Sequence, residues 1–566
     1  MDNLNLQDIK IGEDADISEL RNTVTLLLNI VEKLWTSQEK LLIENQSLKD
    51  EINRLKGEQG VPKFKPKKEK TPQNNDYSSK GKEKGGNKVK EKAKENRRDK
   101  IVIDKEVKVE VSLNDLPTDA KFTGYDEVIQ QNVKLLRENT LYKVAVYYSA
   151  SEKRTIRGNL PEEYAGQYGS DLKALIHGLH HVCDTTQGRL ECLLHSLGIV
   201  ISSGTISNIL NNELDWAKSE QEEILKAGIS CSDFVQTDST SNKEKGESRT
   251  THIFSGEYFS VYSTLESKSR LAVLYGLQGG AGSIDMLNIA YNESTLGLLE
   301  GYNLSKKDKA ALLKEFEGET TSLGTFKERV EQNIPELAKK PNMFIRAQHA
   351  FALSHYYHQE EMPSVQVLLS DDAPEYTKIA PSHGLCWVHD ARFYNKLNPI
   401  IGLHREVKER FMNRYWNFYQ LLLEFREIPS DQIEQQEALE EKINQEFDTI
   451  FTTKTNYAQL DNLINKTFAK KDQLLVVLKV ATLPLHNNAA ELAARRIVRK
   501  RDISLHTWSE KGTQTRDAFL SIVETAIKLS INPFEYIRNR ICSNAPFDNL
   551  AMLIRRAYYA QFTPMF

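Results

Sequence analysis

The chain has 566 residues, of which 39% are hydrophobic and 27% charged, and its formal net charge is −4. This length exceeds what a single core usually holds, so we expect several domains with apolar content for at least one substantial core. The five cysteines lack a paired spacing, residues 1–10 are polar without an apolar signal region, and no apolar run reaches membrane-spanning length. These features predict a cytoplasmic, multidomain α+β protein with reduced thiols and exclude a membrane role.

Residues 16–56 carry a strict seven-residue repeat in which ten of twelve seam residues are apolar. β-Branched residues at the first seam position with Leu at the second favour a parallel two-stranded coiled coil, and an apolar face that widens in the middle leaves a trimer or tetramer open. An amphipathic helix packed on the chain's own globular part is the alternative. The predicted oligomerisation residues are Leu20, Leu27, Leu34, Leu41, Asn45, Leu48 and Leu55.

Residues 57–100 change abruptly to Lys, Gly, Asn, Pro and Glu, and residues 61–100 have a net charge of plus nine. This composition predicts a basic flexible linker, which either contacts DNA phosphates or only solubilises the chain. Residues 101–169 indicate a small β-rich module, with Val-rich residues 101–111 and a strand near residues 142–148. This module contains no cysteine, so no structural zinc is expected in it.

Residues 170–227 show a pattern typical of a helix-turn-helix region. Ser170 opens one helix, residues 186–197 form another, Gly198 breaks it, and Ser202 begins a third. Apolar residues of the last helix, Ile206, Ile209 and Leu210, would face inward. A plain helical bundle is the alternative. The residues predicted to face a DNA groove are Ser203, Thr205, Ser207 and Asn208.

Three distant segments each offer an acid in a setting that suits a metal-dependent nuclease. Asp238 follows a short strand at residues 231–237, Asp371 follows a strand at residues 365–369, and Glu491 lies in a helix that Asn487 or Asn488 caps. Hard carboxylate oxygens suit two divalent ions that catalyse phosphoryl transfer. This order of two strand aspartates and a helix glutamate is the chemistry of a DNA-cutting transposase. Asp372 is the nearest rival of Asp371.

Several short phrases accompany these acids. They are Gln236-Thr237-Asp238-Ser239-Thr240, Ser269-Arg270, Ser370-Asp371 with Tyr376, Cys386-Trp387-Val388-His389 with Arg392-Phe393, and Asn487-Asn488-Ala489-Ala490-Glu491 with Arg495. On these phrases, the stretch from about residue 170 to residue 539, together with the amino-terminal coil, resembles the transposases of the insertion-sequence 66 group. Ser239, His486 and Leu492 depart from the group's usual residues, and the cysteine pairs that hold zinc in many members are missing.

The resemblance implies a ribonuclease-H-like α/β catalytic core and a DDE transposase that cleaves transposon ends and transfers the strands into target DNA. It makes Asp238, Asp371 and Glu491 the catalytic residues and the ligands of two divalent metal ions, Mg²⁺ with Mn²⁺ as a substitute. The partners would be transposon-end and target DNA, a homodimer or higher oligomer, and accessory proteins of the same element, with nucleoid association on DNA. The basic residues predicted to bind DNA are Arg270, Arg392, Arg495, Arg496, Lys500 and Arg501.

The predicted core comes in three parts, because long helical stretches interrupt it. The parts are residues 228–282, 363–400 and 481–545, the helical insertions are residues 283–362 and 401–480, and residues 546–566 form a C-terminal tail. Cys386 and His389 are half of a zinc site by spacing, but without a second pair we expect Cys386 and Trp387 to pack on the sheet. A catalytically inactive regulator derived from such an enzyme, or a coiled-coil scaffold, is the alternative function.

Overall fold

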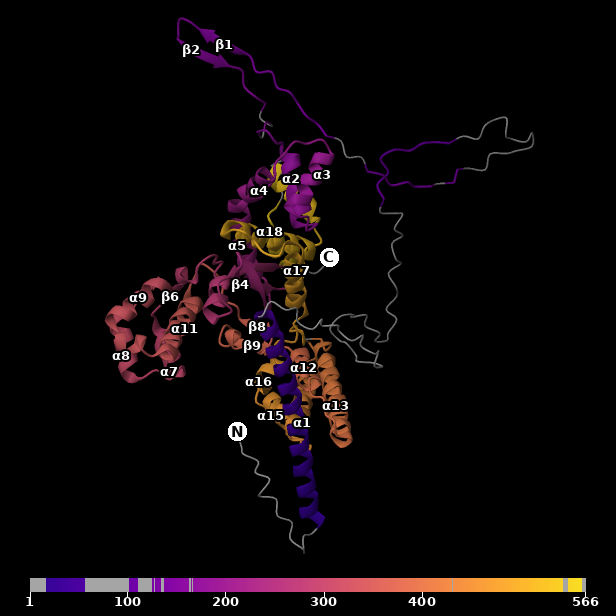
Figure 1. Cartoon of the computed structure of the whole chain (residues 1–566), viewed down its shortest axis with the longest axis vertical. Coiled ribbons are helices and arrows are strands. Elements are labelled where there is room, and N and C mark those ends of the chain that lie inside the picture. The colour runs from indigo at the N-terminus through magenta and orange to yellow at the C-terminus, as the bar shows by residue number, and fades with distance from the viewer. Residues whose placement is uncertain are drawn as a thin grey trace, which may run out of the picture.

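The computed structural model describes most of the chain outside the predicted linker (Figure 1). The described residues are 17–55, 101–109, 125–126, 128–133, 137–161, 164, 166–429, 431–542 and 548–561. The predicted linker at residues 57–100 therefore lies outside them. All five cysteines are free. Among the described helices, none combines the length and the apolar character that crossing a membrane requires.

A five-stranded mixed sheet lies at the centre of the fold and confirms the predicted α+β class. Its strands run in the order β5-β4-β3-β8-β9. The first three form the predicted antiparallel meander, whereas β8 pairs parallel with β3, and β9 parallel with β8. The bounds are β3 (Val235–Glu244), β4 (Glu247–Ser255), β5 (Ser260–Leu265), β8 (Val367–Ser370) and β9 (Ser382–Leu385).

Strand β3 differs from its predicted range. Cys231 follows the preceding helix, and the strand begins at Val235 and continues beyond Asp238 to Glu244. Its polar second half pairs with β4 across a turn in which Lys245 and Gly246 both have positive φ. Two consecutive residues with positive φ suit the tight turn of a hairpin. This turn allows β3 to continue to Glu244, although the composition of the segment predicted an earlier end of the strand. Asp238 therefore lies within the strand and not at its end.

Helices cover both faces of the sheet. Ile253 and Tyr262, which pair across β4 and β5, cluster with Ala493 and Ile497 of α17. Residues adjacent to them on the same strands point the other way and join the main core, as strand alternation requires. The helices that surround the sheet are α5 (Leu214–Ser230), α6 (Arg270–Leu277), α12 (Trp387–Asn395), α17 (Asn488–Ser504), α18 (Glu510–Lys528) and α19 (Pro533–Cys542).

Residues predicted as a C-terminal tail include another helix, α20 (Leu550–Ala560), whose Leu550, Ala551 and Ile554 are buried in the main core. Apolar residues at this helical spacing form one face, and the face packs on α5 because burial removes it from water. The described part of the tail therefore belongs to the folded body.

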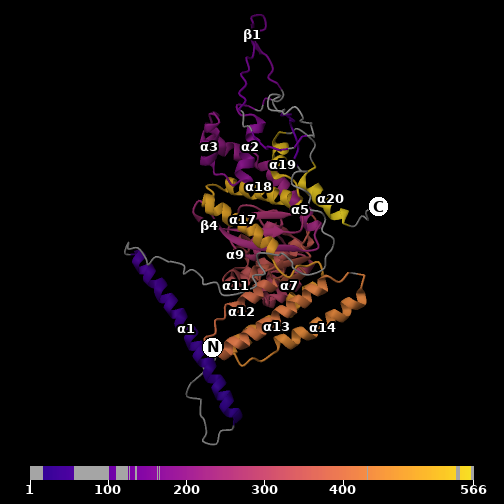
Figure 2. The ribbon, with the colours of Figure 1, turned by 90° about the vertical axis from the view of Figure 1, so that its right-hand side faces the viewer.

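Two helical segments interrupt the fold, the first between two strands of the sheet and the second between the last strand and α17. The first, between α6 and β8, contains a small sheet that the sequence did not predict, formed by β6 and β7. Its elements are β6 (Asn288–Ala290), α7 (Glu293–Gly301), α8 (Lys306–Phe316), β7 (Thr320–Ser322), α9 (Leu323–Asn333), α10 (Pro335–Ala338) and α11 (Pro341–His358). The second follows α12 and has its own core around Trp387, Tyr415 and Phe447 (Figure 2). It comprises α13 (Gly402–Arg426), α14 (Ile433–Phe451), α15 (Ala458–Phe468) and α16 (Lys471–Leu474).

The helices expected at residues 170–227 are α2 (Ser170–His181), α3 (Gln187–Ser196) and α4 (Ser203–Asn212), followed by α5. Gly198 has φ +77° and closes α3, with Ile199 N–H donating to the Leu194 carbonyl, a C-terminal motif that glycine favours. The Ser202 hydroxyl accepts from Thr205 N–H and caps α4. Ile206, Ile209 and Leu210 are buried, as predicted.

The amino-terminal part projects from this body (Figures 1 and 2). Residues 17–55 form a single helix, α1 (Ile17–Leu55). In the region expected to be β-rich, β1 (Val146–Ser149) and β2 (Arg154–Arg157) form a hairpin. Residues 101–109 form no strand, although the region was expected to be β-rich. Val102, Val107 and Val109 are exposed, so these residues lack the packed neighbours that favour a strand.

Candidate active site

Two aspartates lie at the same level on adjacent parallel strands. In the register of β3 and β8, Gln236 pairs with Leu369. Asp238, two residues further within β3, and Asp371, directly after the last residue of β8, therefore lie at the same level. Residues two apart on a strand share a face, which places the two carboxylates side by side. Electrostatic coupling between them agrees with this placement.

Glu491 joins them from the first turn of α17. The buried Asn487 side chain donates through Nδ2 to the Thr237 carbonyl at 2.7 Å, and the Ala489 amide donates to Oε1 of Gln236 at 3.2 Å. The start of α17 is thereby bonded to the residues that precede Asp238. Sequence reasoning treated Asn487 as a cap candidate only and gave Gln236 no role of its own. Their shared role depends on a contact between segments far apart in the chain.

Burial dominates the electrostatics of the two aspartates. Burial, together with smaller effects of the Asp371 and Glu491 carboxylates, raises the pKa of Asp238 to about 6 against the Ser239 amide and Lys268, which lower it. Burial also raises the pKa of Asp371, against the influence of Lys268. Oδ1 of Asp371 is buried with no hydrogen-bond partner among the described residues. These are the properties of carboxylates that attract a cation.

Arg392 and His389 on α12 face Glu491. Nη2 of Arg392 lies 3.3 Å from both carboxylate oxygens, and Nε2 of His389 lies 3.6 Å from Oε1. Burial and then the Arg392 charge lower the pKa of His389, although Glu491 opposes them. Arg392 was predicted to bind DNA, but in this structure it is the nearest counter-ion of Glu491.

Cys386 and Trp387 pack as expected. Both are buried, the Cys386 sulfur accepts from the Asn487 amide, and the Trp387 indole donates to the Leu474 carbonyl. Burial raises the pKa of the Cys386 thiol to about 11, which keeps it protonated near neutrality. The pair therefore links α12 to the start of α17, and only His389 of the Cys-x-x-His phrase reaches the acids.

Asp372 points to a different partner from Asp371. It is exposed and its carboxylate pairs with Lys470 from the second helical segment. Consecutive residues leave a strand in opposite directions, which explains the divergence.

Lys268 was missed by sequence reasoning. Its Nζ lies 3.0 Å from Glu375, and its charge lowers the pKa of both aspartates. Only its position before the Ser269-Arg270 phrase pointed to it.

Three of the basic residues predicted to bind DNA are engaged within the protein. Arg270 donates to the Tyr302 hydroxyl and the Pro374 carbonyl, and so joins the first helical segment to the loop after β8. Lys500 is 6% exposed, and Arg496 pairs with Asp184 at 2.5 Å. The charges of these three residues have internal partners in this structure, and their contact with DNA stays a prediction.

The remaining predicted DNA contacts lie at or near the surface. Arg495 is exposed and 4.0 Å from Glu491, and Arg501 donates to the Ser241 carbonyl at 2.6 Å. On α4, Ser203 and Asn208 are exposed, and Thr205 and Ser207 are partly exposed. The structure leaves all of them accessible, and their role stays a prediction.

In this structure the three acidic side chains do not form a complete metal-binding cluster. Among the described residues, no group of three or more His, Cys, Asp or Glu side chains is close enough to hold a metal ion. Arg392 engages both oxygens of Glu491. The donor chemistry nevertheless fits a divalent ion, because hard carboxylate oxygens converge and one oxygen of Asp371 is unpartnered.

Comparison with known proteins connects this geometry to a family. Residues 354–515 match the model of the family described as "Transposase IS66 family". These residues are therefore similar to the transposase domain of that family. An uncharacterized protein of Sinorhizobium fredii, y4jO, is 27% identical over 318 residues, which cover 56% of this chain and 94% of that protein. No solved structure matches the chain.

The residues that match the family model include most of the candidate site. Asp371, Arg392 and Glu491 lie within residues 354–515, together with β8, β9 and the second helical segment. Asp238 lies before the matched residues, on the strand that pairs with β8. This similarity supports a role in DNA transposition, and the DDE transposases imply divalent metal ions in general.

Proposed function

We propose that the protein is a DDE transposase that cleaves DNA at transposon ends and transfers the strands into target DNA. The observation that carries the proposal is the alignment of Asp238 with Asp371 on β3 and β8, with Glu491 on the helix bonded to β3. We interpret the sheet as the ribonuclease-H-like core that the resemblance implies, because three antiparallel strands continue into two parallel ones.

Asp238, Asp371 and Glu491 would hold two divalent ions, Mg²⁺ with Mn²⁺ as a substitute. When bound, such ions activate an attacking oxygen and neutralise the leaving oxygen of an in-line phosphoryl transfer. The carboxylates must be ionised to bind them, and Glu491 must leave Arg392. Water then replaces the 3'-oxygen at the scissile phosphate of each end, and the freed 3'-hydroxyl attacks a target phosphate. The first step hydrolyses one phosphodiester bond, the second exchanges a target phosphodiester bond for one to the transposon end, and neither needs a covalent protein–DNA intermediate.

DNA contact and oligomer formation belong to the same proposal. Helix α4 presents Ser203, Ser207 and Asn208 away from its buried face, as a recognition helix requires. Arg495 and Arg501 extend from α17 near the acids and would contact phosphates. The seam of α1 would join at least two copies, so that two transposon ends meet in one complex, with accessory proteins of the element as further partners.

The test is cleavage and strand transfer of labelled DNA that carries the element's own ends, with Mg²⁺ or Mn²⁺. We expect metal-dependent products from the intact protein and their loss in Asp238→Asn and Glu491→Gln. Asp372→Asn is the matched control, because that carboxylate pairs with Lys470 at the surface. Products that persist in the first two variants would refute the site. Tight end binding without any products would favour the inactive regulator.

A further inference from the structure

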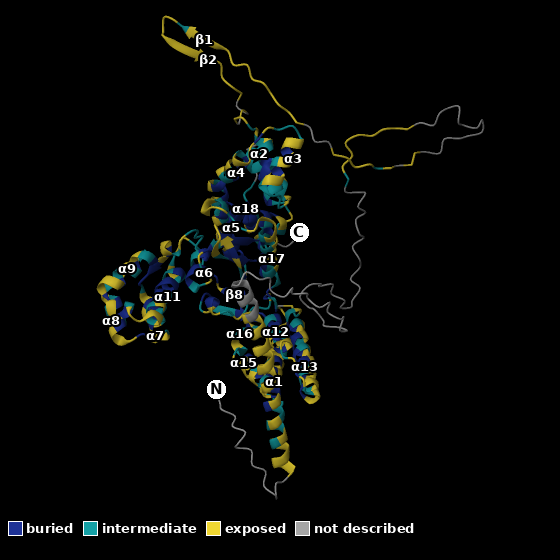
Figure 3. Ribbon diagram, viewed as in Figure 1, coloured by how far each residue is buried: buried dark blue, intermediate teal, exposed yellow. Residues whose placement is uncertain are grey.

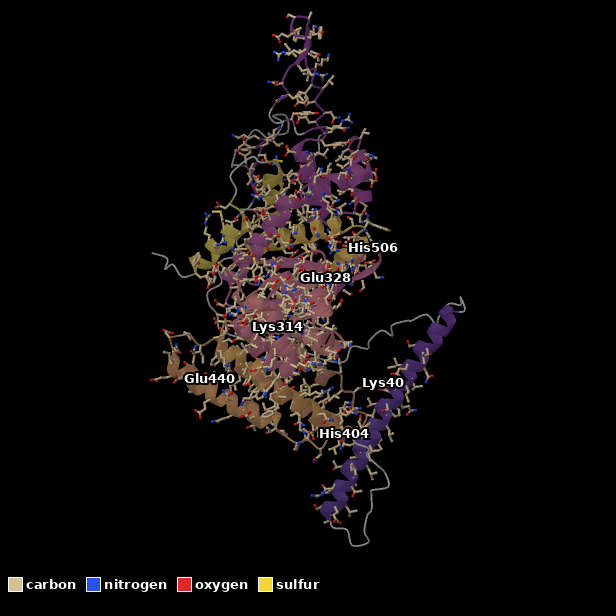
Figure 4. All side chains as sticks on the ribbon, turned by 90° about the vertical axis from the view of Figure 1, so that its left-hand side faces the viewer. Lys40, Lys314, Glu328, His404, Glu440 and His506 are labelled. Atoms are coloured by element: carbon tan, nitrogen blue, oxygen red, sulfur yellow. The ribbon has the colours of Figure 1, made fainter. Side chains whose placement is uncertain are left out.

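The amino-terminal helix rests on the second helical segment of its own chain through one buried acid. Glu32 is 1% exposed. Its carboxylate accepts from the Ile400 amide at 2.8 Å and the Ile401 amide at 3.4 Å, and it lies 3.3 Å from Nδ1 of His404. Figure 4 shows His404 beside α1.

Glu32 lies at the N-terminal end of α13. The residue that precedes α13, Ile401, offers no side-chain cap to the first amides of the helix. Free amides and the helix dipole favour a negative charge at this end, so a carboxylate from α1 stabilises it. Glu32 thus places a carboxylate at the N-terminal end of α13, where it accepts from the amides of the two residues before the helix.

Two further polar residues of α1 continue the contact. Asn29 donates through Nδ2 to the Asn456 carbonyl at 2.9 Å and accepts from the Ala458 amide at 2.8 Å. The Thr36 hydroxyl accepts from Nε2 of Gln459 at 3.4 Å. These partners precede or begin α15, so one stripe of α1 contacts the ends of two helices of the same segment.

The contact stripe and the predicted seam lie on different faces of α1. Asn29, Glu32 and Thr36 are three and four residues apart and share one side of the helix. At 3.6 residues per turn, their stripe is about 170° around the axis from Leu20, Leu27 and Leu34 of the seam. Docking on the body therefore leaves the seam free.

The seam is exposed, whereas Glu32 at the centre of the contact stripe is buried. Val24, Val31 and Leu34 are 53%, 49% and 61% exposed, and Figure 3 shows α1 mainly as exposed surface. A continuous apolar stripe of this kind marks an interaction site. Its seven-residue repeat fits a second copy of the same stripe, since identical seams interdigitate in a parallel coiled coil.

We propose that Glu32 is a latch that fixes each α1 to the body of its own chain, so that the seam faces outward toward the seam of a second copy. The two bodies then lie on the outer flanks of one coiled coil, in an orientation set by Glu32, Asn29 and Thr36. This rests on the coiled coil of the proposed function and adds which face of α1 belongs to the body and which to the partner.

The experiment measures the latch and the seam separately in the full chain without DNA. Amide hydrogen exchange of Ile400 and Ile401 reports the latch, and the mass in solution reports the seam. In Glu32→Ala we expect about tenfold faster exchange of these amides with an unchanged oligomer mass. Glu39→Ala, an exposed glutamate on the same helix, is the control and should change neither.

Leu27→Asp combined with Leu34→Asp tests the seam. This variant should have the mass of a single chain and keep the slow exchange of Ile400 and Ile401. Glu32→Gln keeps an acceptor of the same shape and should exchange at an intermediate rate, which separates the latch from misfolding. Unchanged exchange in Glu32→Ala, fast exchange in the seam variant, or a wild-type mass of one chain would overturn the proposal. None of these readouts depends on transposase activity.

Discussion

The Arg392 guanidinium lies across the carboxylate of Glu491, with Nη2 3.3 Å from each oxygen. Nη1 of the same side chain is 2.5 Å from Nε2 of His389. A positive charge at this position neutralises Glu491 in the absence of a metal ion. Arg392 and a divalent ion therefore compete for the same two oxygens.

Removal of the Arg392 side chain should increase the affinity for a metal ion while the fold stays intact. We expect Arg392→Ala to bind Mn²⁺ several-fold more tightly than the intact protein by calorimetry, because Glu491 loses its competing cation. Arg495→Ala is the control, since Arg495 is 4.0 Å from the same carboxylate and 49% exposed. Weaker Mn²⁺ binding in Arg392→Ala would contradict the competition and indicate that Arg392 only orients Glu491.

Substitution of the adjacent aspartates should separate their roles. Asp371→Asn removes a carboxylate aligned with Asp238 and should reduce metal-dependent cleavage at least about a hundredfold, the scale on which loss of a charge-stabilising group acts. Asp372→Asn breaks only a surface pair with Lys470 and should cleave normally. Initial rates with the same labelled ends measure both. Loss of cleavage in Asp372→Asn, with normal cleavage in Asp371→Asn, would identify Asp372 as the second metal ligand.

The pKa of Asp238, raised to about 6, predicts how stability depends on pH. A raised carboxyl pKa favours the protonated folded state, so this stabilisation is complete below the ordinary value of 3.8 and is lost as pH rises through about 6. At pH 8 without metal, Asp238→Asn should therefore be more stable, by on the order of 1–3 kcal/mol. The gain should shrink toward pH 5.

Thermal unfolding of both proteins between pH 5 and 8, with a chelator present, measures this difference. Metal-dependent cleavage by the intact protein should fall as pH drops through about 6, because protonated Asp238 no longer offers a charged ligand. Equal melting temperatures of the two proteins at pH 8 would show that the acids do not repel one another as the geometry indicates.

Asp184 is expected to hold α17 on the loop between α2 and α3. It pairs with Arg496 at 2.5 Å and Lys500 at 3.4 Å, and Lys500 also donates to the His180 carbonyl. Asp184→Ala leaves buried charge unpaired and should destabilise the protein by about 3–5 kcal/mol. Adding Lys500→Met should recover part of this loss. Asp502→Ala, at an exposed acid of the same helix, is the control.

Differential scanning calorimetry compares these variants. Burial lowers the pKa of Lys500 to about 8, while Asp184 opposes the shift. The stability linked to this lysine is complete above its ordinary value of 10.5 and is lost as pH falls through about 8. The benefit of Lys500→Met in the double variant should therefore be larger at pH 7 than at pH 9. A melting temperature of Asp184→Ala equal to that of Asp502→Ala would refute the clamp.

Local patterns determined much of this protein without tertiary information. The repeat of leucines predicts α1, Gly198 and Ser202 mark the end of α3 and the start of α4, and Gly256 marks the hairpin of β4 and β5. These signals act over a few residues, through backbone angles, caps and side-chain periodicity, so a sequence shows them directly. The identities of the three acids also came from short phrases.

Long-range packing decided what the residues do. The register that pairs Gln236 with Leu369 brings Asp238 level with Asp371 across an intervening helical segment. The same kind of contact turns Lys500 inward to Asp184 and seats Glu32 on α13. The sequence does not distinguish a charged side chain on a solvated face from one in a buried ion pair, because the partner of the buried one lies hundreds of residues away. Only the tertiary structure distinguishes the two.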